Sequence, residues 1–330
     1  MQLGIAISRA SALDATWTTV HLAHAALERG HRVRFIEPSD MEIDEQGHMV
    51  ARAFCFEPPG PEMDVMVRML QERDAPRRYL RVDRLDVLLL RHNPFDSALL
   101  ALAGRARDLG VDVVNDPGAI LRVCHKGWLA TLPGVNTPPT LVTRAVGSAH
   151  LFLERQARAV VVKPAQGSGG FNVSLVPAGD HAALDEAFPR AAARSRHVIV
   201  QTYVEPNEVG EKRLVWMDGQ ILGGYLRVRA EGEFRHNLKQ GGTPASLQIS
   251  AADHAIVAPL SVHLEQVGIR IAGIDLLGDH ILEVNALNPG GAFHADRLHG
   301  TDVTGAIIDR LEHPPRVISR GRADWPTIVP

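Results

Sequence analysis

The chain has 330 residues, enough for two or three units of ordinary domain size that each bury a core. Its 45% apolar and 22% charged residues exclude a disordered chain, and a net charge of −3 gives no reason to expect nucleic acid or an anionic membrane as partner. The two cysteines form no CxxC or metal spacing and no apolar run approaches a membrane span, so we expect a cytoplasmic protein without disulfides.

The first residues predict a β-α-β unit. Residues 3–7 have the pattern of an apolar strand, residues 20–27 have helical spacing that ends at Gly30, and residues 33–36 have the pattern of a second strand. This order favours a parallel sheet covered by helices. The turn after the first strand lacks GxGxxG, so dinucleotide binding is poorly supported.

A third strand is predicted at residues 85–90, nearly all apolar, and it ends at Arg91. Ligands bind beyond the carboxyl ends of such strands, so Arg91 is a candidate for holding a substrate carboxylate, the alternative being a solvated arginine. Five arginines between residues 73 and 84 favour a solvated helix face over a functional basic patch. A helix at 98–109 and a strand at 111–115 follow, and the first unit closes near residue 120.

The middle of the chain carries a candidate phosphate-binding loop. A connecting helix is predicted at residues 121–131, and a strand at 159–164 leads directly into the glycine-rich residues 165–171. Successive N–H groups in such a loop can cradle phosphate oxygens. Lys163 precedes the glycines, so this is not a Walker loop, and a glycine-rich hairpin tip without ligand is the alternative.

Two further segments fit a nucleotide site. The strand at 197–206 breaks at a proline, where its backbone can meet an adenine edge while Tyr203 and Val204 pack on the ring. Residues 211–217 and 220–228 are predicted to form a hairpin around Asp218-Gly219. Residues 227–242 are too basic and glycine-rich to be core, which fits a mobile lid over an anionic ligand.

The most informative stretch is the predicted hairpin at residues 272–285. With a three-residue loop at 278–280, Leu277 faces Ile281 and Asp275 faces Glu283, so that Asp275, Glu283 and Asn285 share one face. The other face, which we expect to be core, then holds Ile274, Leu276, Leu282 and Val284. Two carboxylates and an amide oxygen suit Mg²⁺, whereas the alternative is a surface hairpin with solvated acids.

In this order the motifs resemble the ATP-grasp ligases and, among these, the bacterial glutathione synthetase family. The resemblance covers nearly the whole length. It rests on residues 91–96, 115–117, 124–126, 163–164, 167–170, Asp275 and 283–285. It implies an α/β fold, α+β overall, with three units: a Rossmann-like N-terminal unit at 1–120, a small lid at 121–203, and a larger unit bearing the metal hairpin at 204–330.

The resemblance also implies roles for individual residues. ATP would be held at its phosphates by Lys126, Lys163, Gly167, Ser168, Gly169 and Gly170, at adenine by Gln201, Tyr203 and Val204, at ribose by Glu211, and by Gly241. Asp275, Glu283 and Asn285 would bind Mg²⁺, two ions with Mn²⁺ as a substitute. Arg213, Arg235 and Asn237 would be catalytic, and Arg91, Asn288 and Gly290 would contact the acid and amine substrates.

The implied activity is an ATP-dependent carboxylate–amine ligation through an acyl phosphate, with a γ-glutamyl dipeptide and an amino acid as substrates and a dimer or tetramer as assembly. One departure concerns residues 288–291, Asn-Pro-Gly-Gly, where the family usually has Ser or Thr beside the proline. A ligase for another acid and amine, and a kinase-like phosphotransferase, therefore stay as alternatives. The complete metal set argues against a nucleotide-binding protein without catalysis.

Overall fold

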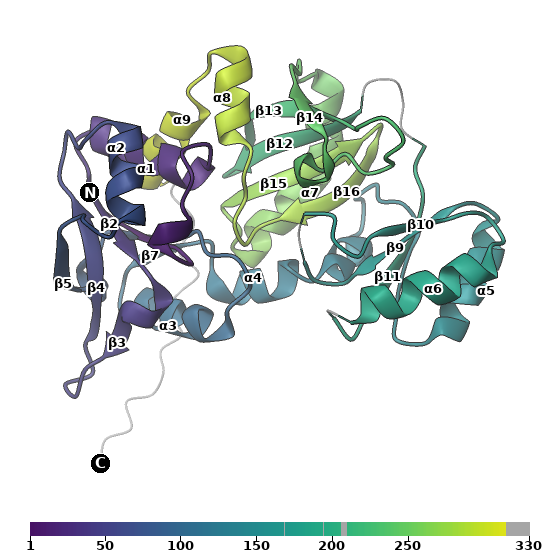
Figure 1. Cartoon of the computed structure of the whole chain (residues 1–330), viewed down its shortest axis with the longest axis horizontal. Coiled ribbons are helices and arrows are strands. Elements are labelled where there is room, and N and C mark those ends of the chain that lie inside the picture. The colour runs from purple at the N-terminus through teal and green to yellow at the C-terminus, as the bar shows by residue number, and fades with distance from the viewer. Residues whose placement is uncertain (168, 194, 206–209, 315–330) are drawn as a thin grey trace.

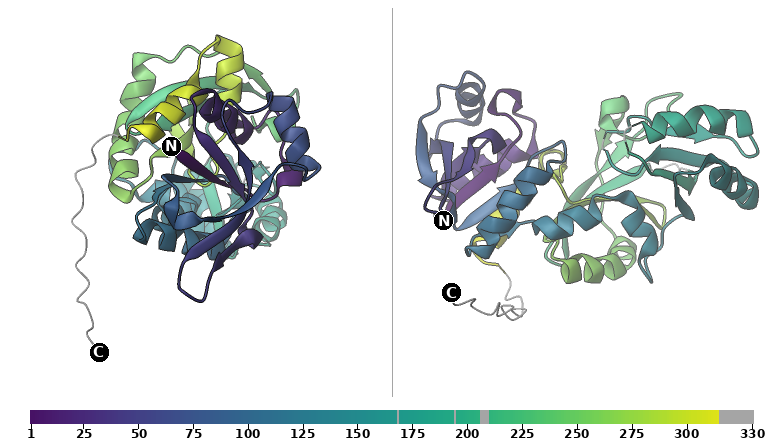
Figure 2. Two further views of the ribbon diagram at one scale, coloured as in Figure 1. Left: turned by 90° about the vertical axis from the view of Figure 1, so that its left-hand side faces the viewer. Right: turned by 90° about the horizontal axis from the view of Figure 1, so that it is seen from below.

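The computed structural model describes residues 1–167, 169–193, 195–205 and 210–314. The structure contains three β-sheets (Figures 1 and 2). The first and the second, in chain order, lie toward opposite ends of the molecule, and the third lies between them. The helices are α1 Thr18–Glu28, α2 Met63–Gln71, α3 Ser97–Asp108, α4 Pro117–Val123, α5 Val146–Gln156, α6 His181–Ala192, α7 Ala251–Val267, α8 Ala292–His299 and α9 Val303–Glu312.

The first sheet contains the predicted parallel strands. Its members are β1 Gln2–Ala6, β2 Arg32–Ile36, β3 Met41–Ile43, β4 Met49–Phe56, β5 Arg77–Arg81, β6 Val87–Leu90 and β7 Asp112–Val114. The order is β3-β4-β2-β1-β6-β7, with β5 paired to β4. Because β1 is parallel to both β2 and β6, the carboxyl ends of β1 and β6 form the crevice where ligands of such sheets bind.

The second sheet is small and antiparallel. It contains β8 Thr140–Thr143, β9 Val160–Pro164, β10 Ser174–Val176 and β11 Val198–Thr202, in the order β10-β9-β11-β8. Helices α5 and α6 bury one face of it in a separate apolar core that includes Val162, Leu184 and Val200. The predicted strand before the glycine-rich loop is thus β9, and the predicted strand before Tyr203 is β11.

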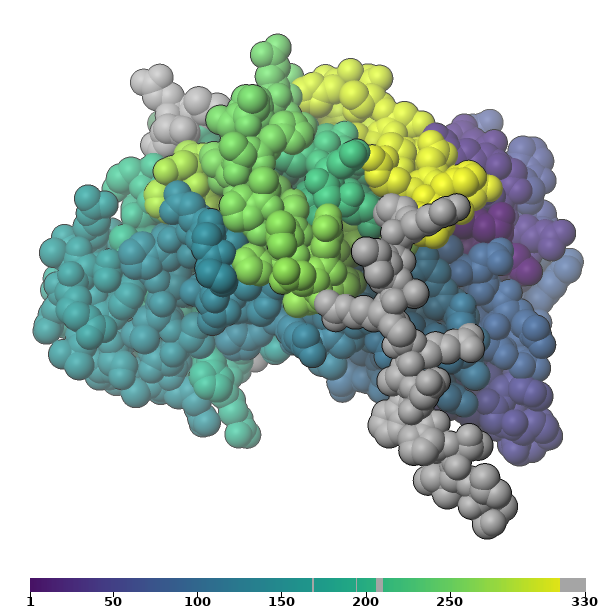
Figure 3. Space-filling view, turned by 180° about the vertical axis from the view of Figure 1, so that it is seen from behind, coloured from purple at the N-terminus to yellow at the C-terminus, as the bar shows by residue number. Residues whose placement is uncertain are grey.

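The third sheet is built from two hairpins. Its strands are β12 Glu211–Met217, β13 Gln220–Val228, β14 Thr243–Ala245, β15 Ile271–Leu277 and β16 His280–Asn285, in the order β14-β13-β12-β15-β16. Leu260 of α7 belongs to the core cluster that contains Trp216 and Ile274 of this sheet and Leu88 of the first sheet. The C-terminal helices α8 and α9 lie against the N-terminal part of the chain (Figure 3), where Arg29, the residue directly after α1, pairs with Asp302 and Asp309 at 2.7 Å.

Two predicted helices are wrong. The arginine-rich stretch between residues 73 and 84 contains strand β5, where Arg77 stacks 4.6 Å from the Phe54 ring and pairs with Asp40. The connecting helix at 121–131 is instead α4 followed by a 3₁₀ helix, Lys126–Thr131. His125 separates the two because its backbone is extended and its ring accepts a hydrogen bond from the Gly127 N–H.

Among the described residues, no helix is long and apolar enough to cross a membrane.

Candidate active site

The three predicted metal ligands, Asp275, Glu283 and Asn285, lie on the hairpin of β15 and β16, which is called the metal-type hairpin below. Asp275 pairs with Glu283 as predicted, but the turn has two residues, so that Leu277 faces His280 and not Ile281. A bulge beside Leu276 absorbs the one-residue difference and leaves Leu282 without a partner strand residue. The predicted core position of Leu282 is therefore wrong: Leu282 lines the cavity described below, and Ile281 enters the core in its place.

Asp275, Glu283 and Asn285 converge. Asn285 Nδ2 lies 3.4 Å from Asp275 Oδ2, and with the amide turned over it donates to Glu283 Oε1 at 3.1 Å. Basic residues of the same chain balance both acids. Lys126 Nζ donates to Glu283 Oε1 at 2.5 Å, and Arg213 Nη2 donates to Asp275 Oδ2 at 2.9 Å.

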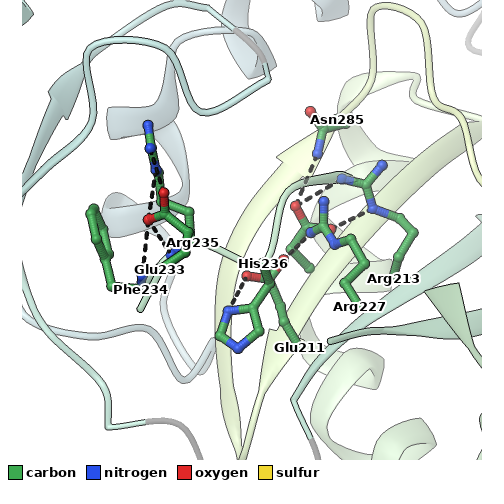
Figure 4. Close-up of polar contacts among 9 residues, drawn as sticks. Glu211, Arg213, Arg227, Glu233, Phe234, Arg235, His236 and Asn285 are labelled. Atoms are coloured by element: carbon green, nitrogen blue, oxygen red, sulfur yellow. Dashed lines mark hydrogen bonds and ion pairs between the residues drawn. The ribbon is translucent and has the colours of Figure 1, made fainter. Parts of the chain in front are cut away.

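Arg227 is a site residue that sequence reasoning missed. It is 4% exposed and pairs with Glu211 (Figure 4). It also pairs with Asp275 at 2.7 Å. Burial alone would raise the pKa of Asp275, but Arg213 and Arg227 outweigh it and lower that pKa. Counting back from the Asp218-Gly219 turn puts Leu226 opposite Glu211, and only the bulge between Val215 and Trp216 brings Arg227 there.

Lys163 stands at the end of β9, directly before the glycine-rich loop. Its side chain is 9% exposed, and its ammonium donates to Gln201 Oε1 at 3.0 Å. Burial lowers its pKa to about 8, and no carboxylate bonds to it in the described part of the chain. A buried cation of this kind is suited to an anionic ligand.

Residues 235–240, which lie in the segment 227–242 predicted to be a lid, contact the glycine-rich loop. Arg235 Nη1 donates to the Gly170 carbonyl at 2.8 Å, and Gln240 Nε2 donates to the Gly169 carbonyl at 2.9 Å. Asn237 packs so close to Gly170 that a Cβ atom there would lie 2.8 Å from Asn237 Oδ1. Gly169 and Gly170 both have positive φ, which explains the glycines. Ser168 lies outside the described residues.

His236, in the same lid segment, is a second residue that was missed. It is 4% exposed, and its Nδ1 atom lies 3.7 Å from Glu211 (Figure 4). Burial, with Arg227 and Arg229, lowers its pKa to about 4, so the imidazole is neutral at physiological pH. A single histidine between Arg235 and Asn237 carries no sequence signal for such a position.

These side chains line one cavity of about 340 Å³. The predicted residues in its lining are Lys126, Lys163, Gly167, Gly169, Gly170, Gln201, Tyr203, Val204, Glu211, Arg213, Arg235, Asn237, Asp275, Glu283, Asn285 and Asn288. Gly241, Arg91 and Gly290 are not among the lining residues, and Gly241 serves instead to end the 3₁₀ helix Leu238–Gln240 with a φ of 85°.

Arg91 is buried against the turn that follows the metal-type hairpin, so it is neither solvated nor exposed to the cavity. Its Nη1 donates to the Pro289 carbonyl at 2.6 Å, its Nε donates to Thr19 Oγ1 at 3.1 Å, and its own carbonyl accepts from Asn288 Nδ2 at 3.1 Å. The Gly291 N–H donates to Thr18 Oγ1 at 3.2 Å. The turn at 288–291 is thus held at the crevice of the first sheet.

The oxygen ligands fit a hard divalent cation. Asp275, Glu283 and Asn285 offer two carboxylates and an amide, the donors that Mg²⁺ takes. Among the described residues no cluster of three or more His, Cys, Asp or Glu side chains could hold a metal ion. An ion here would therefore need oxygens from water or from substrate phosphates, which is how Mg²⁺ is commonly held in nucleotide sites.

The fold defines the class of protein. The chain superimposes on a D-cycloserine synthetase (TM-score 0.64, 18% identity, covering 94% of this chain and 99% of that chain). It also matches the D-alanine–D-alanine ligase from Coxiella burnetii (TM-score 0.60, 11% identity, covering 94% of each chain). The predicted α/β ATP-grasp fold is confirmed.

Sequence comparison narrows the class to a family. Residues 1–122 match the prokaryotic glutathione synthetase N-terminal domain, and residues 128–300 match the prokaryotic glutathione synthetase ATP-grasp domain. Identity is 31% to the glutathione synthetase of Synechococcus elongatus (94% of this chain, 98% of that one) and 30% to that of Pseudomonas putida (87% and 90%). The chain belongs to the prokaryotic glutathione synthetase family, which confirms the predicted class of ATP-dependent carbon–nitrogen ligase.

Proposed function

We propose that this chain joins γ-glutamylcysteine to glycine and converts ATP to ADP and phosphate. Family membership supports this, and the observation that carries it is the cavity, where oxygen ligands and basic side chains face the same space. Six lysine and arginine residues line it: Lys126, Lys163, Arg213, Arg227, Arg235 and Lys239. A triphosphate and an acidic substrate would together bring the negative charge that such a lining balances.

The nucleotide would lie with its base between Tyr203, Val204 and Leu282 and its phosphates toward Lys163 and the glycine-rich loop, with Gly241 supporting the lid. Glu211 would accept from the ribose hydroxyls. Asp275, Glu283 and Asn285 would hold one or two Mg²⁺ ions, with Mn²⁺ as a substitute. The bound metal would spread the charge of the phosphates and so reduce their repulsion of the acid.

The chemistry requires an activated acid, because a carboxylate has no leaving group for an amine to displace. Transfer of the γ-phosphoryl group to the acid makes an acyl phosphate, and the amine then attacks its carbon and releases phosphate. Arg235 and Asn237, in the lid, would orient the γ-phosphate and the acid. Arg213 would stabilise the tetrahedral oxyanion.

The turn at 288–291 bears on the identity of the acid and the amine. Arg91, Asn288 and Gly290 would shape this substrate site, with Asn288 in the cavity lining and Arg91 acting through the turn. The Asn288 side chain stands where the resemblance leads us to expect a hydroxyl, and its Oδ1 is a buried acceptor without a partner among the described residues. This observation favours, as second candidate, a ligase of the same mechanism for another acid and amine.

The test is an assay of ADP release over a panel of γ-glutamyl dipeptides, other acids and amino acids. We expect release to require both an acid and an amine, with γ-glutamylcysteine and glycine giving the highest kcat/KM. Highest activity with a different pair would select the second candidate. Release with one acceptor and a persistent phosphorylated product would contradict ligation and indicate a kinase-like phosphotransferase.

We also propose the three-unit division at 1–120, 121–203 and 204–330. Each proposed unit contains one of the three sheets, which supports the boundaries. A cytoplasmic location, a dimer or tetramer, and the lack of nucleic-acid or membrane partners stay predictions. Size-exclusion chromatography with light scattering would measure the assembly.

A further inference from the structure

Three side chains form a continuous hydrogen-bonded relay across the second sheet. Lys163 Nζ donates to Gln201 Oε1 at 3.0 Å, and Gln201 Nε2 donates to Thr140 Oγ1 at 2.9 Å. The Thr140 hydroxyl in turn donates to the Pro138 carbonyl at 2.8 Å. The relay therefore runs from a main-chain carbonyl to the ammonium group that faces the cavity.

Only one assignment of donors and acceptors fits this relay. The Pro138 carbonyl can only accept, so the Thr140 hydroxyl must donate to it and accept from the next group. A lysine ammonium can only donate, so Gln201 must turn its oxygen toward Lys163 and its nitrogen toward Thr140. The two ends thus determine the amide orientation, which heavy-atom positions alone leave ambiguous.

The sheet register places the relay on the cavity side. Thr140 lies directly opposite Gln201, and Lys163 lies opposite Ile199, two residues before Gln201 on the same face. Val198 and Val200, the alternate residues of β11, point into the core under α5 and α6. Because side chains alternate between the faces of a strand, Gln201 and Lys163 lie on the face away from that core.

The relay holds the ammonium without neutralising it. Gln201 is 7% exposed and Lys163 is 9% exposed, and leaving either polar end unpaired would be costly. One of the three ammonium N–H donors is used by Gln201, so donors remain for a ligand in the cavity. A carboxylate in the place of Gln201 would bind the ammonium too, but it would cancel the charge that attracts phosphate.

We propose that Gln201 and Thr140 are positioning residues for the phosphate-binding Lys163, and that their side chains do not recognise the adenine base. This inference rests on the proposed ATP site and reassigns the role that the resemblance implied for Gln201. Both polar ends of the amide serve the relay. Recognition of the base is then left to the backbone after Gln201 and to the side chains of Tyr203 and Val204.

The experiment compares ATP with adenosine, which has the base and ribose but no phosphates. Thr140→Val removes the hydroxyl at nearly constant shape, Thr140→Ser keeps it, and Thr143→Val is a matched control on the same strand. Gln201→Leu removes the middle of the relay. Binding is measured by calorimetry with Mg²⁺·ATP and with adenosine, and kcat and KM by ADP release.

We expect Gln201→Leu to weaken ATP binding about tenfold, the size of one lost hydrogen bond to a charged group. Thr140→Val loses a bond between neutral groups and should weaken ATP binding about fivefold, and adenosine affinity should be unchanged in both variants. Thr140→Ser should restore ATP binding, and Thr143→Val should match wild type. An equal loss for ATP and adenosine would overturn the proposal in favour of base reading, and unchanged ATP binding in both variants would overturn it too. A wild-type protein that binds no ATP would instead refute the proposed function itself.

Discussion

The small unit around the second sheet and the rest of the molecule bury their apolar side chains in different ways. The core of the small unit is closed, made from its own sheet with α5 and α6. The first and third sheets share theirs, since one cluster contains Leu88 of the first and Trp216 of the third. The first and third sheets therefore pack together as one body, whereas the second sheet has a core of its own.

The small unit instead meets that body through polar contacts around the cavity. Lys126 donates to Glu283, and Arg235 and Gln240 donate to the Gly170 and Gly169 carbonyls of the glycine-rich loop. Polar contacts can be exchanged for contacts to a ligand at little net cost, whereas a shared apolar core cannot. We therefore expect the small unit to move relative to the other two when nucleotide binds.

The largest effects are expected from a matched pair of core truncations, which tests whether the two cores are separate. Leu184 of α6 and Leu260 of α7 are both fully buried, one in each kind of core. Each change to alanine should cost about 2–5 kcal/mol. In hydrogen exchange followed by mass spectrometry, Leu184→Ala should speed exchange within residues 140–202 only, and Leu260→Ala should do so in both other sheets. Faster exchange everywhere in both variants would contradict separate cores.

The next largest effect concerns the acids of the third sheet. Glu283→Gln should lower kcat by about 100-fold or more, since a metal-type ligand would be lost, with little change in Tm because the side chain is only half-buried. Asp279→Asn, in the exposed turn of the same hairpin, is the control and should keep full activity. Full activity of Glu283→Gln with Mg²⁺ would remove the metal assignment.

A change at Asp275 should behave differently. Asp275→Asn should abolish turnover and also lower the free energy of unfolding, because the buried Arg213 would lose its carboxylate and Arg227 would keep only Glu211. Chemical denaturation of the two variants side by side measures the difference. Equal stability of Asp275→Asn and Glu283→Gln would mean that the arginines find other partners.

The contact between lid and loop should matter less. Arg235→Ala removes the hydrogen bond to the Gly170 carbonyl and should raise KM for ATP about tenfold. Arg190→Ala, on the exposed side of α6, is the matched control and should leave KM unchanged. If KM does not move in Arg235→Ala, the lid does not close over the nucleotide through this residue.

The smallest effect is on pH dependence. Burial lowers the pKa of Lys163 to about 8, with Glu283 and Asp275 opposing the shift and Lys126 adding to it. Below that pH the ammonium is charged and attracts phosphate; as pH rises through 8 it loses its proton, so kcat/KM for ATP should fall several-fold by pH 9. In Lys163→Arg the decline should be absent because the guanidinium stays charged. A flat wild-type profile to pH 9 would refute the shift.

Much of the fold could be predicted because it depends on local patterns. The strands before Arg91, before the glycine-rich loop and at the metal-type hairpin each follow from apolar periodicity and turn residues. The arginine-rich stretch of 73–84 was misread because a strand at the side of a sheet and a solvated helix have the same polar composition, and only pairing with β4 distinguishes them.

Residue order alone determined which side chains can carry the chemistry: the acids of the hairpin, the lysine before the glycines, and the order of the three units. Tertiary structure alone decided which of these meet. The bulges at Leu276 and Val215 moved Leu282 to the cavity and Arg227 to Asp275, and burial removed Arg91 from open space. The physical reason is that strand register and burial depend on partners distant in the chain, which no local pattern encodes.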